Sequence, residues 1–267
     1  MSKPRIDWIA EIKSFAWLGL AFLFVWSAVA KPFYIPSESM LPNLLVGDRL
    51  IVTKYPYGYS YLSMVPQILP HMDGRLFGSL PKRGDVVVVK APNTHEDWIK
   101  RVIGLPGDTV QMKEGALWLN GAPVPRTLMP PLDIVETPNS RCDMLPMYRM
   151  ETPQGAVCRY PRFRETIDGR SFDTLDLGLT EQDDTPPIIV PEGHVFLMGD
   201  NRDNSRDSRF APEVGGLGLL PIENVVGRAE FITFSLDGSS QIFNPISWFT
   251  AMRGGRSGTS LHPHSGQ

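Results

Sequence analysis

The stretch WIKRVIGLPGDTVQMKEGALWLNG, residues 98–121, predicts two consecutive elements of a β fold. Side chains in residues 98–103 alternate as they do along a strand, and the turn GLPGD ends that strand. The segment TVQMKEGALWLNG then has the alternation and the central glycine of a hairpin. Further runs rich in Val and Ile predict strands at residues 48–54, 85–90, 193–198 and 225–235. We therefore expect a mostly β protein.

The composition excludes several classes of protein. A chain of 267 residues forms one or two domains, and 42% hydrophobic residues exclude low-complexity disorder. The 24 glycines and 25 prolines indicate frequent turns and few long helices. A net charge of -3 supplies no basic surface for nucleic acid, so we expect no nucleic-acid partner.

The segment FAWLGLAFLFVWSAVA, residues 15–30, carries no charge and predicts a transmembrane helix. Its 16 residues reach about 24 Å, so Lys13 and Lys31 must extend toward the two lipid surfaces. The basic residues that precede it place residues 1–14 in the cytoplasm and the chain after Lys31 outside. A cleavable signal peptide is the alternative, because Ala28-Val29-Ala30 matches an A-x-A cleavage pattern.

The rest of the chain divides by composition. We predict a catalytic core in two parts, residues 31–122 and 193–252, a smaller inserted domain at 123–192, and a disordered tail at 253–267. The insert is rich in Pro, Asp and Arg, and the tail is rich in Gly, Ser and His. Three apolar residues just before the tail are predicted to be core, with a membrane-interface anchor as the alternative: Ile246, Trp248 and Phe249.

The two cysteines, Cys142 and Cys158, lack the CxxC spacing and the clustered histidines of zinc or thioredoxin-like sites. They are either a disulfide or two free thiols. A disulfide would close a loop of about 15 residues, stabilise the fold by roughly 3 kcal/mol, and require an oxidising compartment.

Three segments carry the candidate chemistry: PSESMLPNL at 36–44, IKRVIGLPGDTV at 99–110 and FLMGDNRDNSRDSRF at 196–210. The sequence has no G-x-S-x-G elbow, no H-E-x-x-H and no Walker loop. The acidic loop that begins at Asp200 has Ser205 where a calcium loop needs glycine, so a calcium site is disfavoured.

Lys100 lies on the strand face that it shares with Trp98 and Val102, whereas Arg101 points the other way. A lysine on an apolar face loses hydration, which lowers the pKa of its amine and allows it to act as a base. Ser39 needs such a base, because none of the five histidines lies in a familiar triad context. Considered separately, Lys100 is typical of a snorkelling edge-strand residue and Ser39 of a polar turn.

In this order behind an apolar amino-terminal segment, the three segments resemble those of bacterial type I signal peptidases, which remove signal peptides from exported proteins. The likeness includes the lysine segment 100–108, the late segment 199–205, and the intervening KYPYG at 54–58 and SLPKRGDVVV at 79–88. It extends over roughly residues 30–229. The resemblance implies a mostly antiparallel β catalytic core with a smaller inserted β-rich domain, preceded by one transmembrane helix.

The resemblance also implies the roles of individual residues. Ser39 would be the nucleophile and Lys100 the general base, with an oxyanion hole formed by the Ser39 backbone N–H and the Ser37 hydroxyl. Supporting residues implied by the late segment are Ser205, which would position the amine, the ion pair of Asp207 with Arg209, and Asp200. Ile35 and Met40 would line the substrate site.

The implied enzyme uses no cofactor and no metal. Its partners are membrane lipid and exported preproteins, bound in extended form along a strand edge and cut after small-x-small sites. It would be a single-pass protein of the bacterial inner membrane with its catalytic domain on the periplasmic side. Ala28-Val29-Ala30 would then be incidental or a site of self-cleavage.

The chain departs from the family pattern at Glu38, Asn43, Arg206, Ala211 and Pro212. Two other interpretations compete with a signal peptidase. The self-cleaving repressors of the DNA-damage response share a Ser/Lys dyad, but they need a DNA-binding amino terminus where this chain has an apolar segment. A membrane-anchored periplasmic adaptor or chaperone would bind preproteins without cutting them.

Overall fold

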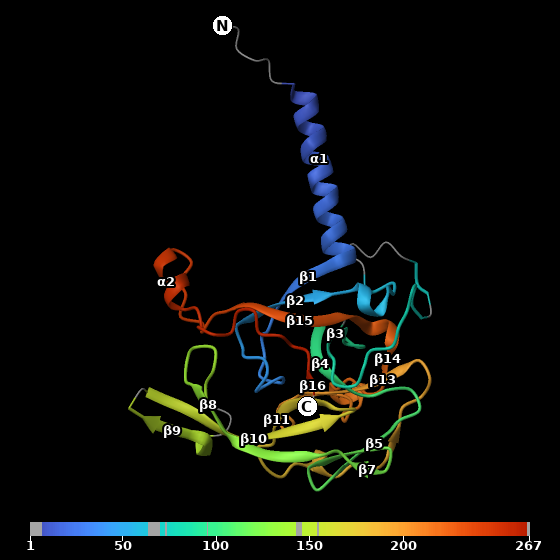
Figure 1. The fold of residues 1–267 in the computed structure, drawn as a ribbon, viewed down its shortest axis with the longest axis vertical. Coiled ribbons are helices and arrows are strands. Elements are labelled where there is room, and N and C mark those ends of the chain that lie inside the picture. Colours follow the sequence, from blue (N-terminus) through green and yellow to red (C-terminus); the bar gives the residue numbers. More distant parts are fainter. Residues whose placement is uncertain are drawn as a thin grey trace.

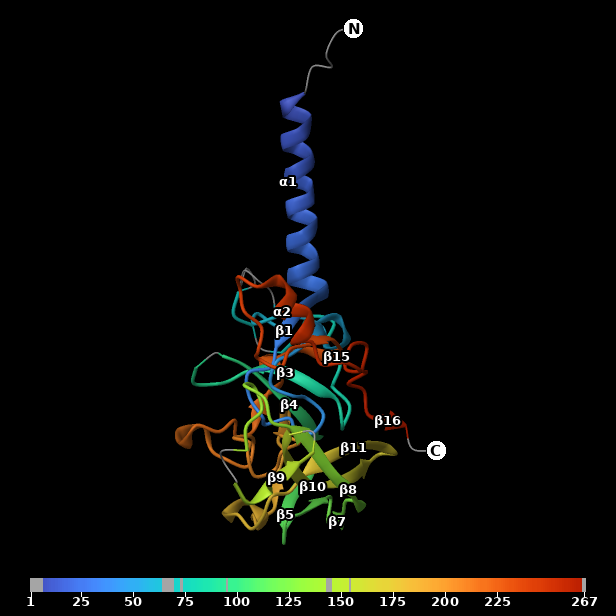
Figure 2. The same cartoon turned by 90° about the vertical axis from the view of Figure 1, so that its left-hand side faces the viewer.

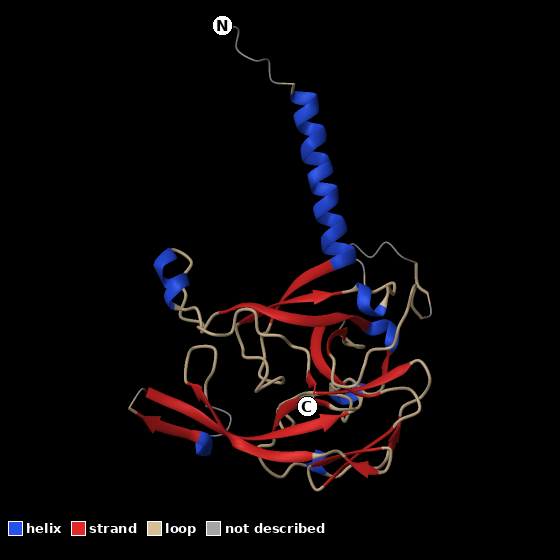
Figure 3. Cartoon of the chain, in the orientation of Figure 1, coloured by secondary structure: helices blue, strands red, loops and turns tan. Residues whose placement is uncertain are grey.

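The computed structural model describes residues 7–63, 70–72, 74–94, 96–142, 146–153 and 155–265. A single long helix projects from a body built of strands (Figures 1 and 2). The helices other than this one are short and lie at the ends of strands or in loops (Figure 3). The fold class predicted from the strand pattern, a mostly β protein behind one amino-terminal helix, is confirmed.

Helix α1, Trp8–Phe24, begins where the side chain of Asp7 accepts hydrogen bonds from the backbone of Ile9 and Ala10. It continues as a π-helical turn, Val25–Val29, and becomes extended at Ala30. None of the α1 side chains is buried, and in the described chain Trp8–Val29 is long and apolar enough to cross a membrane. The helix therefore starts earlier than the predicted span of 15–30, because Asp7 caps it.

The last carbonyls of this helical segment are held by the body. Lys54 donates its backbone N–H to Val29 O at 3.1 Å and its Nζ to Ser27 O at 2.8 Å, and Tyr59 Oη donates to Ala28 O at 2.7 Å. Burial, followed by repulsion from neighbouring cations, lowers the pKa of Lys54 to about 8. These bonds fix the end of the helix directly before the strand that leads to Ser39.

The largest sheet has seven antiparallel strands in the order β1-β2-β15-β3-β4-β13-β14. Its strands are β1 (Ala30–Tyr34), β2 (Asp48–Thr53), β15 (Val225–Ser235), β3 (Val86–Lys90), β4 (Asp97–Gly104), β13 (His194–Met198) and β14 (Leu220–Pro221). Buried Val, Ile and Leu side chains of these strands form the main apolar clusters. The sheet carries β4, and hence Lys100, at its interior.

Two smaller sheets lie on the side of the body away from α1 (Figures 1 and 2). The first contains β12 (Ile188–Ile189), β5 (Thr109–Lys113), β6 (Ala116–Leu119) and β7 (Ala122–Pro123). The second contains β16 (His264–Ser265), β11 (Arg170–Leu175), β10 (Gly155–Ile167) and β8 (Arg126–Val135), with β9 (Arg149–Thr152) paired to β10. The segment expected to be an inserted domain is thus β-rich, and its limits at 123–192 stay a prediction.

Six short helical turns complete the described chain. They are η2 (Tyr55–Tyr57), η3 (Pro146–Tyr148), η4 (Glu181–Asp183), η5 (Pro212–Val214), η6 (Ile222–Asn224) and α2 (Pro245–Thr250). Both side-on views place α2 at the level where α1 meets the body (Figures 1 and 2).

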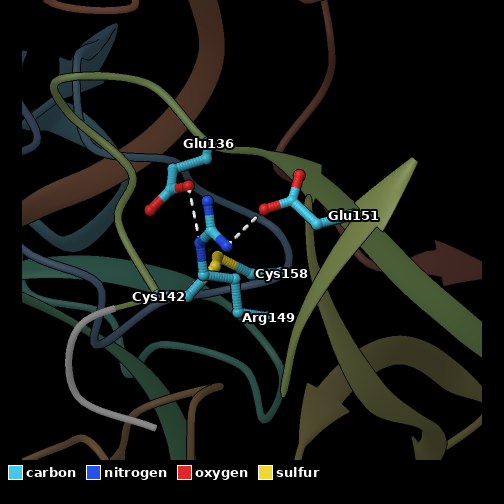
Figure 4. The surroundings of a disulfide bond; sticks show 5 residues. All are labelled: Glu136, Cys142, Arg149, Glu151 and Cys158. Carbon is cyan, nitrogen blue, oxygen red and sulfur yellow. Dashed lines mark hydrogen bonds and ion pairs between the residues drawn. A yellow bond between two sulfur atoms is a disulfide. The ribbon is translucent and has the colours of Figure 1, made fainter. Parts of the chain in front are cut away.

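Cys142 and Cys158 form a disulfide that ties the loop before η3 to strand β10 (Figure 4). Both cysteines are buried in a small apolar cluster that also contains Leu41 of the segment around Ser39. Arg149 lies beside the disulfide and pairs with Glu136 and Glu151. Of the two states left open by the sequence, the structure therefore has the disulfide, which fixes the loop after β8 to β10 and lies in the same apolar cluster as Leu41.

Two expectations for the carboxyl-terminal region are wrong. The predicted disordered tail contains ordered residues up to 265: Arg256 pairs with the fully buried Asp48 carboxylate at 2.5 Å, and β16 pairs with β11. Composition missed this order because it depends on long-range contacts: Arg256 neutralises the buried Asp48 carboxylate, and Leu261 packs in the main apolar cluster.

The predicted core position of the apolar residues before the tail is also wrong, since these side chains are exposed. The exposed residues in and before α2 are Ile242, Phe243, Ile246, Trp248 and Phe249. A six-residue helix has few positions from which to pack against the sheet, so its apolar side chains face outward. The membrane-interface alternative is the one that this exposure fits.

Candidate active site

Ser39 lies in the irregular segment that joins β1 to β2, and only 8% of it is exposed. Apolar neighbours hold this segment in place, because Met40 and Leu44 are fully buried in the main cluster. Asn201 contacts the segment from the late loop, with its backbone N–H on Ser39 O at 3.1 Å and its side chain on Glu38 O at 3.2 Å. The first and third of the three segments singled out in the sequence therefore meet at Ser39.

Lys100 occupies the centre of β4, opposite Val87 of β3, and is 4% exposed. Its Nζ lies 2.9 Å from Ser39 Oγ and 3.0 Å from Ile99 O. Burial lowers the pKa of Lys100 to about 8, although the carboxylates of Asp207 and Asp200 oppose the shift. An amine with that pKa is partly neutral near physiological pH and can accept a proton from a hydroxyl within hydrogen-bonding distance.

Ser37 lies on the exposed side of the nucleophile segment, with its Oγ 3.5 Å from Ser39 Oγ. No described residue accepts a hydrogen bond from the Ser39 backbone N–H. The Ser37 hydroxyl and the Ser39 backbone N–H are thus two donors near the Ser39 side chain, and their role in an oxyanion hole stays a prediction.

Gly199 lets the late loop, residues 199–210, approach the segment that contains Ser39 closely. A Cβ at this position would overlap Ser205 Oγ and the carbonyl oxygen of Ser39. Ser205 is buried, and within the described chain its hydroxyl has no hydrogen-bond partner. The structure therefore brings Ser205 into the site but does not join it to the Lys100 amine.

Asp207 and Arg209 form a buried bidentate ion pair, with Nε–Oδ1 and Nη2–Oδ2 distances of 2.9 Å. Burial acts to raise the pKa of Asp207, but the Arg209 guanidinium and the backbone N–H of Gly199 hold it below its usual value. The pair fixes the late loop and leaves a negative charge near Lys100.

Asp200 makes a second buried bidentate pair with Arg101, at 2.6 Å for both bonds. The alternation of β4 explains this geometry, since Arg101 points to the face opposite Lys100. Asn43 joins the same carboxylate at 2.7 Å and also donates to Asp173 O of β11. The sequence analysis did not assign a role to Arg101 or Asn43. A signal for Arg101 was available, because a charged side chain on either face of a buried strand needs a partner of opposite charge.

We expect Asp200→Asn to lower the free energy of unfolding by about 3–5 kcal/mol, because it leaves the Arg101 guanidinium buried without its counter-charge. Urea unfolding of the detergent-solubilised protein, followed by tryptophan fluorescence, measures this change. The matched control is Asp133→Asn, which removes a bidentate partner of Arg159 on the surface and should have a much smaller effect on the free energy of unfolding. Equal effects of the two substitutions would contradict a structural role for the buried pair.

A cleft of about 740 Å³ opens over Ser39 and Lys100. Its apolar wall is formed by Phe33, Ile35, Val88, Trp98 and Ile99, and its polar groups include Ser37, Ser205 and Arg206. Ile35 is among the residues that line the cleft and Met40 is not, and the substrate-binding role of either residue stays a prediction. Met40 points into the core instead, where its fully buried side chain packs with Leu44 and Val226.

Within the described residues, no group of three or more His, Cys, Asp or Glu side chains is placed to hold a metal ion. The groups around the apolar cleft include the Ser39 hydroxyl, the Lys100 amine and the Ser37 hydroxyl.

Residues 6–234 match a family described as "Signal peptidase, peptidase S26". The chain is 35% identical over 235 residues to a signal peptidase I of Rickettsia canadensis, an alignment covering 84% of this chain and 79% of the relative. It is 34% identical over 236 residues to that of Rickettsia typhi, covering 84% and 80%. A solved signal peptidase I from Enterococcus faecalis is 25% identical and covers 56% of this chain and 97% of its own, with a TM-score of 0.29.

Proposed function

We propose, because this chain belongs to the signal peptidase family of S26 peptidases, that Ser39 and Lys100 are its nucleophile and general base. Membership makes the chain a serine endopeptidase that removes signal peptides, as its three sequence segments indicated. The observation that carries the assignment is the 2.9 Å contact between the buried Lys100 amine and the Ser39 hydroxyl.

In the proposed reaction, neutral Lys100 takes the proton of Ser39 as Ser39 Oγ attacks the scissile carbonyl. The oxyanion that forms accepts hydrogen bonds from the Ser39 N–H and the Ser37 hydroxyl. Lys100 then donates its proton to the leaving amine, which leaves the signal peptide as an ester on Ser39. Lys100 next deprotonates a water that attacks the ester. It returns this proton to Ser39 Oγ as the ester bond breaks, and the signal peptide departs with a new carboxylate.

Ser205 and the Asp207–Arg209 pair are proposed to position the base. The Ser205 hydroxyl is buried in the lining of the same cleft and has an acceptor oxygen for the protonated Lys100 amine. The ion pair keeps the late loop in place, and the Asp207 carboxylate stabilises the Lys100 ammonium that forms during the reaction.

The apolar wall supports binding of small side chains before the cut. Ile35 and Ile99 already fill the space next to Ser39, so we propose that an extended peptide is accepted when its first and third residues before the cut are small. This is the small-x-small pattern of the proposed cleavage site.

Helix α1 is consistent with membrane anchoring, and we propose a cytoplasmic amino terminus with the β body outside. The disulfide fits an oxidising compartment on that side. The exposed apolar side chains around α2 lie at the level where α1 meets the body and would rest on the lipid surface, which keeps the cleft close to membrane-held substrates.

The Ala28-Val29-Ala30 pattern is proposed to be incidental rather than a site of self-cleavage. Ala30 pairs with Thr53 in the sheet, and the carbonyls of Ala28 and Val29 accept hydrogen bonds from Tyr59 and Lys54. The segment would have to leave all of these contacts to enter an active site.

Cleavage of a model preprotein in detergent micelles, with mass spectrometry of the product, tests the proposed function. We expect one new amino terminus directly after a small-x-small sequence. No cleavage of several different preproteins would instead favour the adaptor interpretation, in which the fold binds preproteins without cutting them.

A further inference from the structure

A second cavity of about 230 Å³ lies next to the nucleophile segment, and we call it the exit pocket. Its lining residues are Glu38, Tyr160, Leu177, Gly178, Leu179, Thr180, Asn201, Asp203 and Asn204. The volume is below the 300–1,000 Å³ of whole-ligand pockets and suits one or two side chains. Asp203 and Asn204 line both the exit pocket and the catalytic cleft, so the two cavities adjoin beside Ser39.

The two cavities are walled by different parts of the chain. The catalytic cleft is walled by residues 33–37, the continuation of the strand that starts at the end of the membrane helix. The exit pocket is walled by residues 177–180, which follow β11, and by Tyr160 of β10, and these strands lie in the part of the body away from α1 (Figures 1 and 2).

The positions of the two cavities constrain the direction in which a preprotein can bind. Its signal peptide has an apolar segment that stays in the membrane to which α1 belongs, so the residues before the cut approach along the membrane-side wall. The residues after the cut continue past Ser39 in the other direction, away from the membrane. Glu38, which stands between Ser37 and Ser39 in the sequence, lines the exit pocket.

The exit pocket is acidic. Glu38 and Asp203 contribute carboxylates, and no lysine or arginine is among the described residues that line it. Asn204 Nδ2 donates to Glu38 Oε2 at 3.4 Å, so the carboxylate of Glu38 faces the pocket wall shared with the catalytic cleft. Burial, followed by the charge of Glu38, raises the pKa of the neighbouring Tyr160 to about 12.

Asp203 has one carboxylate oxygen without a partner. Its Oδ2 accepts the backbone N–H of Leu177, whereas Oδ1 is buried and, within the described chain, receives no hydrogen bond. A buried acceptor without a donor carries a desolvation cost, which a donor supplied by a bound chain would remove.

We propose that the exit pocket binds the first side chains after the cleavage site and selects basic or hydrogen-bond-donating residues there over acidic ones. An ammonium or amide N–H would be attracted by the two carboxylates and could supply the donor that Asp203 Oδ1 lacks, whereas a carboxylate would be repelled. This inference rests on the proposed function, because it concerns the part of the substrate that follows the bond cut at Ser39.

The test compares three preproteins that differ only at the second residue after the cut, which is Lys, Gln or Glu. For the wild-type enzyme we expect kcat/KM to be about fivefold higher with Lys than with Glu, with Gln between them, as for one partly screened charge pair. The ratio of kcat/KM for the Lys substrate to that for the Glu substrate should approach 1 in Glu38→Gln. It should be lower than the wild-type ratio in Asp203→Asn. Because the ratio is taken within each variant, a general loss of activity cancels.

The matched control is Glu192→Gln, which removes an exposed carboxylate that lines neither cavity and should leave the ratio at the wild-type value. The wild-type ratio should also decrease as salt rises, since screening weakens a charge preference. That measurement needs no variant to fold.

Three outcomes would overturn the inference. One is equal cleavage of the three preproteins by the wild type, another is a wild-type ratio that salt does not change, and the last is a ratio in Glu38→Gln equal to that in Glu192→Gln. Failure of the wild type to cut any of the three would overturn the proposed function, and is thereby distinguished from failure of the exit pocket alone.

Discussion

Replacing Ser39 by alanine is expected to reduce preprotein cleavage by a factor on the order of 10⁴ to 10⁶, the loss seen when a serine peptidase loses its nucleophile. Replacing Lys100 by methionine should cause a loss of similar size, because the Ser39 hydroxyl has no other described base within hydrogen-bonding distance. The two effects should not add, since nucleophile and base act as one unit. Initial rates of preprotein cleavage in detergent micelles measure the two single variants and the double variant that combines them.

Methionine is the informative replacement for Lys100 because it keeps the length and the apolar stem while it removes the amine. Thermal unfolding should show that the variant folds, since a buried amine is exchanged for an apolar group. The matched control is Lys113→Met, a lysine near the end of β5 that lies outside the cleft and should leave the rate unchanged. A folded Lys100→Met variant that keeps a tenth of the wild-type rate would contradict the assignment of the base.

The rate should rise steeply with pH up to about 8 and then level off. Only the neutral Lys100 amine can accept the Ser39 proton, and a pKa of about 8 makes it half neutral at pH 8. About a tenth of the amine is neutral at pH 7 and about a hundredth at pH 6. The pH profile of kcat/KM should therefore show one ascending limb, with a roughly hundredfold range between pH 6 and the plateau.

The direction of a shift in that limb is a further check on the same prediction. Asp207 raises the pKa of Lys100 and Arg209 lowers it, so Asp207→Asn removes the stabilising charge and leaves the opposing one. The limb should move to lower pH in any Asp207→Asn protein that folds. A limb centred near 6.5, or a profile that is flat from pH 6 to 9, would show that an amine with the pKa of Lys100 is not the base.

The strands were predictable because local composition and burial agree. Runs rich in Val and Ile predicted β2, β3 and β15, and the alternation of side chains along β4 placed Lys100 and Arg101 on opposite faces. The family was predictable because three ordered segments carry it. The three segments also predicted that Ser39 and Lys100 act together, and the structure places Lys100 Nζ 2.9 Å from Ser39 Oγ, while their catalytic roles stay a prediction.

The remaining features depend on tertiary contacts that the sequence does not encode locally. Met40 adjoins the nucleophile, but the chain turns its side chain into the core rather than the cleft. The exposure of Trp248 follows from the small size of α2, and the order of the tail follows from several long-range contacts, among them the Arg256–Asp48 ion pair. Apolar composition alone cannot distinguish a core helix from a surface patch.

The exit pocket is another feature that could not be predicted from the sequence. Glu38 is an unremarkable polar residue within PSESM, and Asp203 is one acid in a loop of many. Only the fold places them side by side around a cavity that adjoins Ser39, with residues 177–180 from a distant part of the chain as the far wall.

The most direct test of the central assignment is to find which residue forms the covalent bond with substrate. A small-x-small peptide that ends in a serine-reactive phosphonate ester should attach once per chain, with mass spectrometry locating the adduct on Ser39. The rate of adduct formation should depend on pH in the same way as the rate of cleavage. The adduct should be absent in Ser39→Ala and in Lys100→Met. An adduct on any other residue, or equally fast labelling of Lys100→Met, would contradict the account of Ser39 as a nucleophile activated by Lys100.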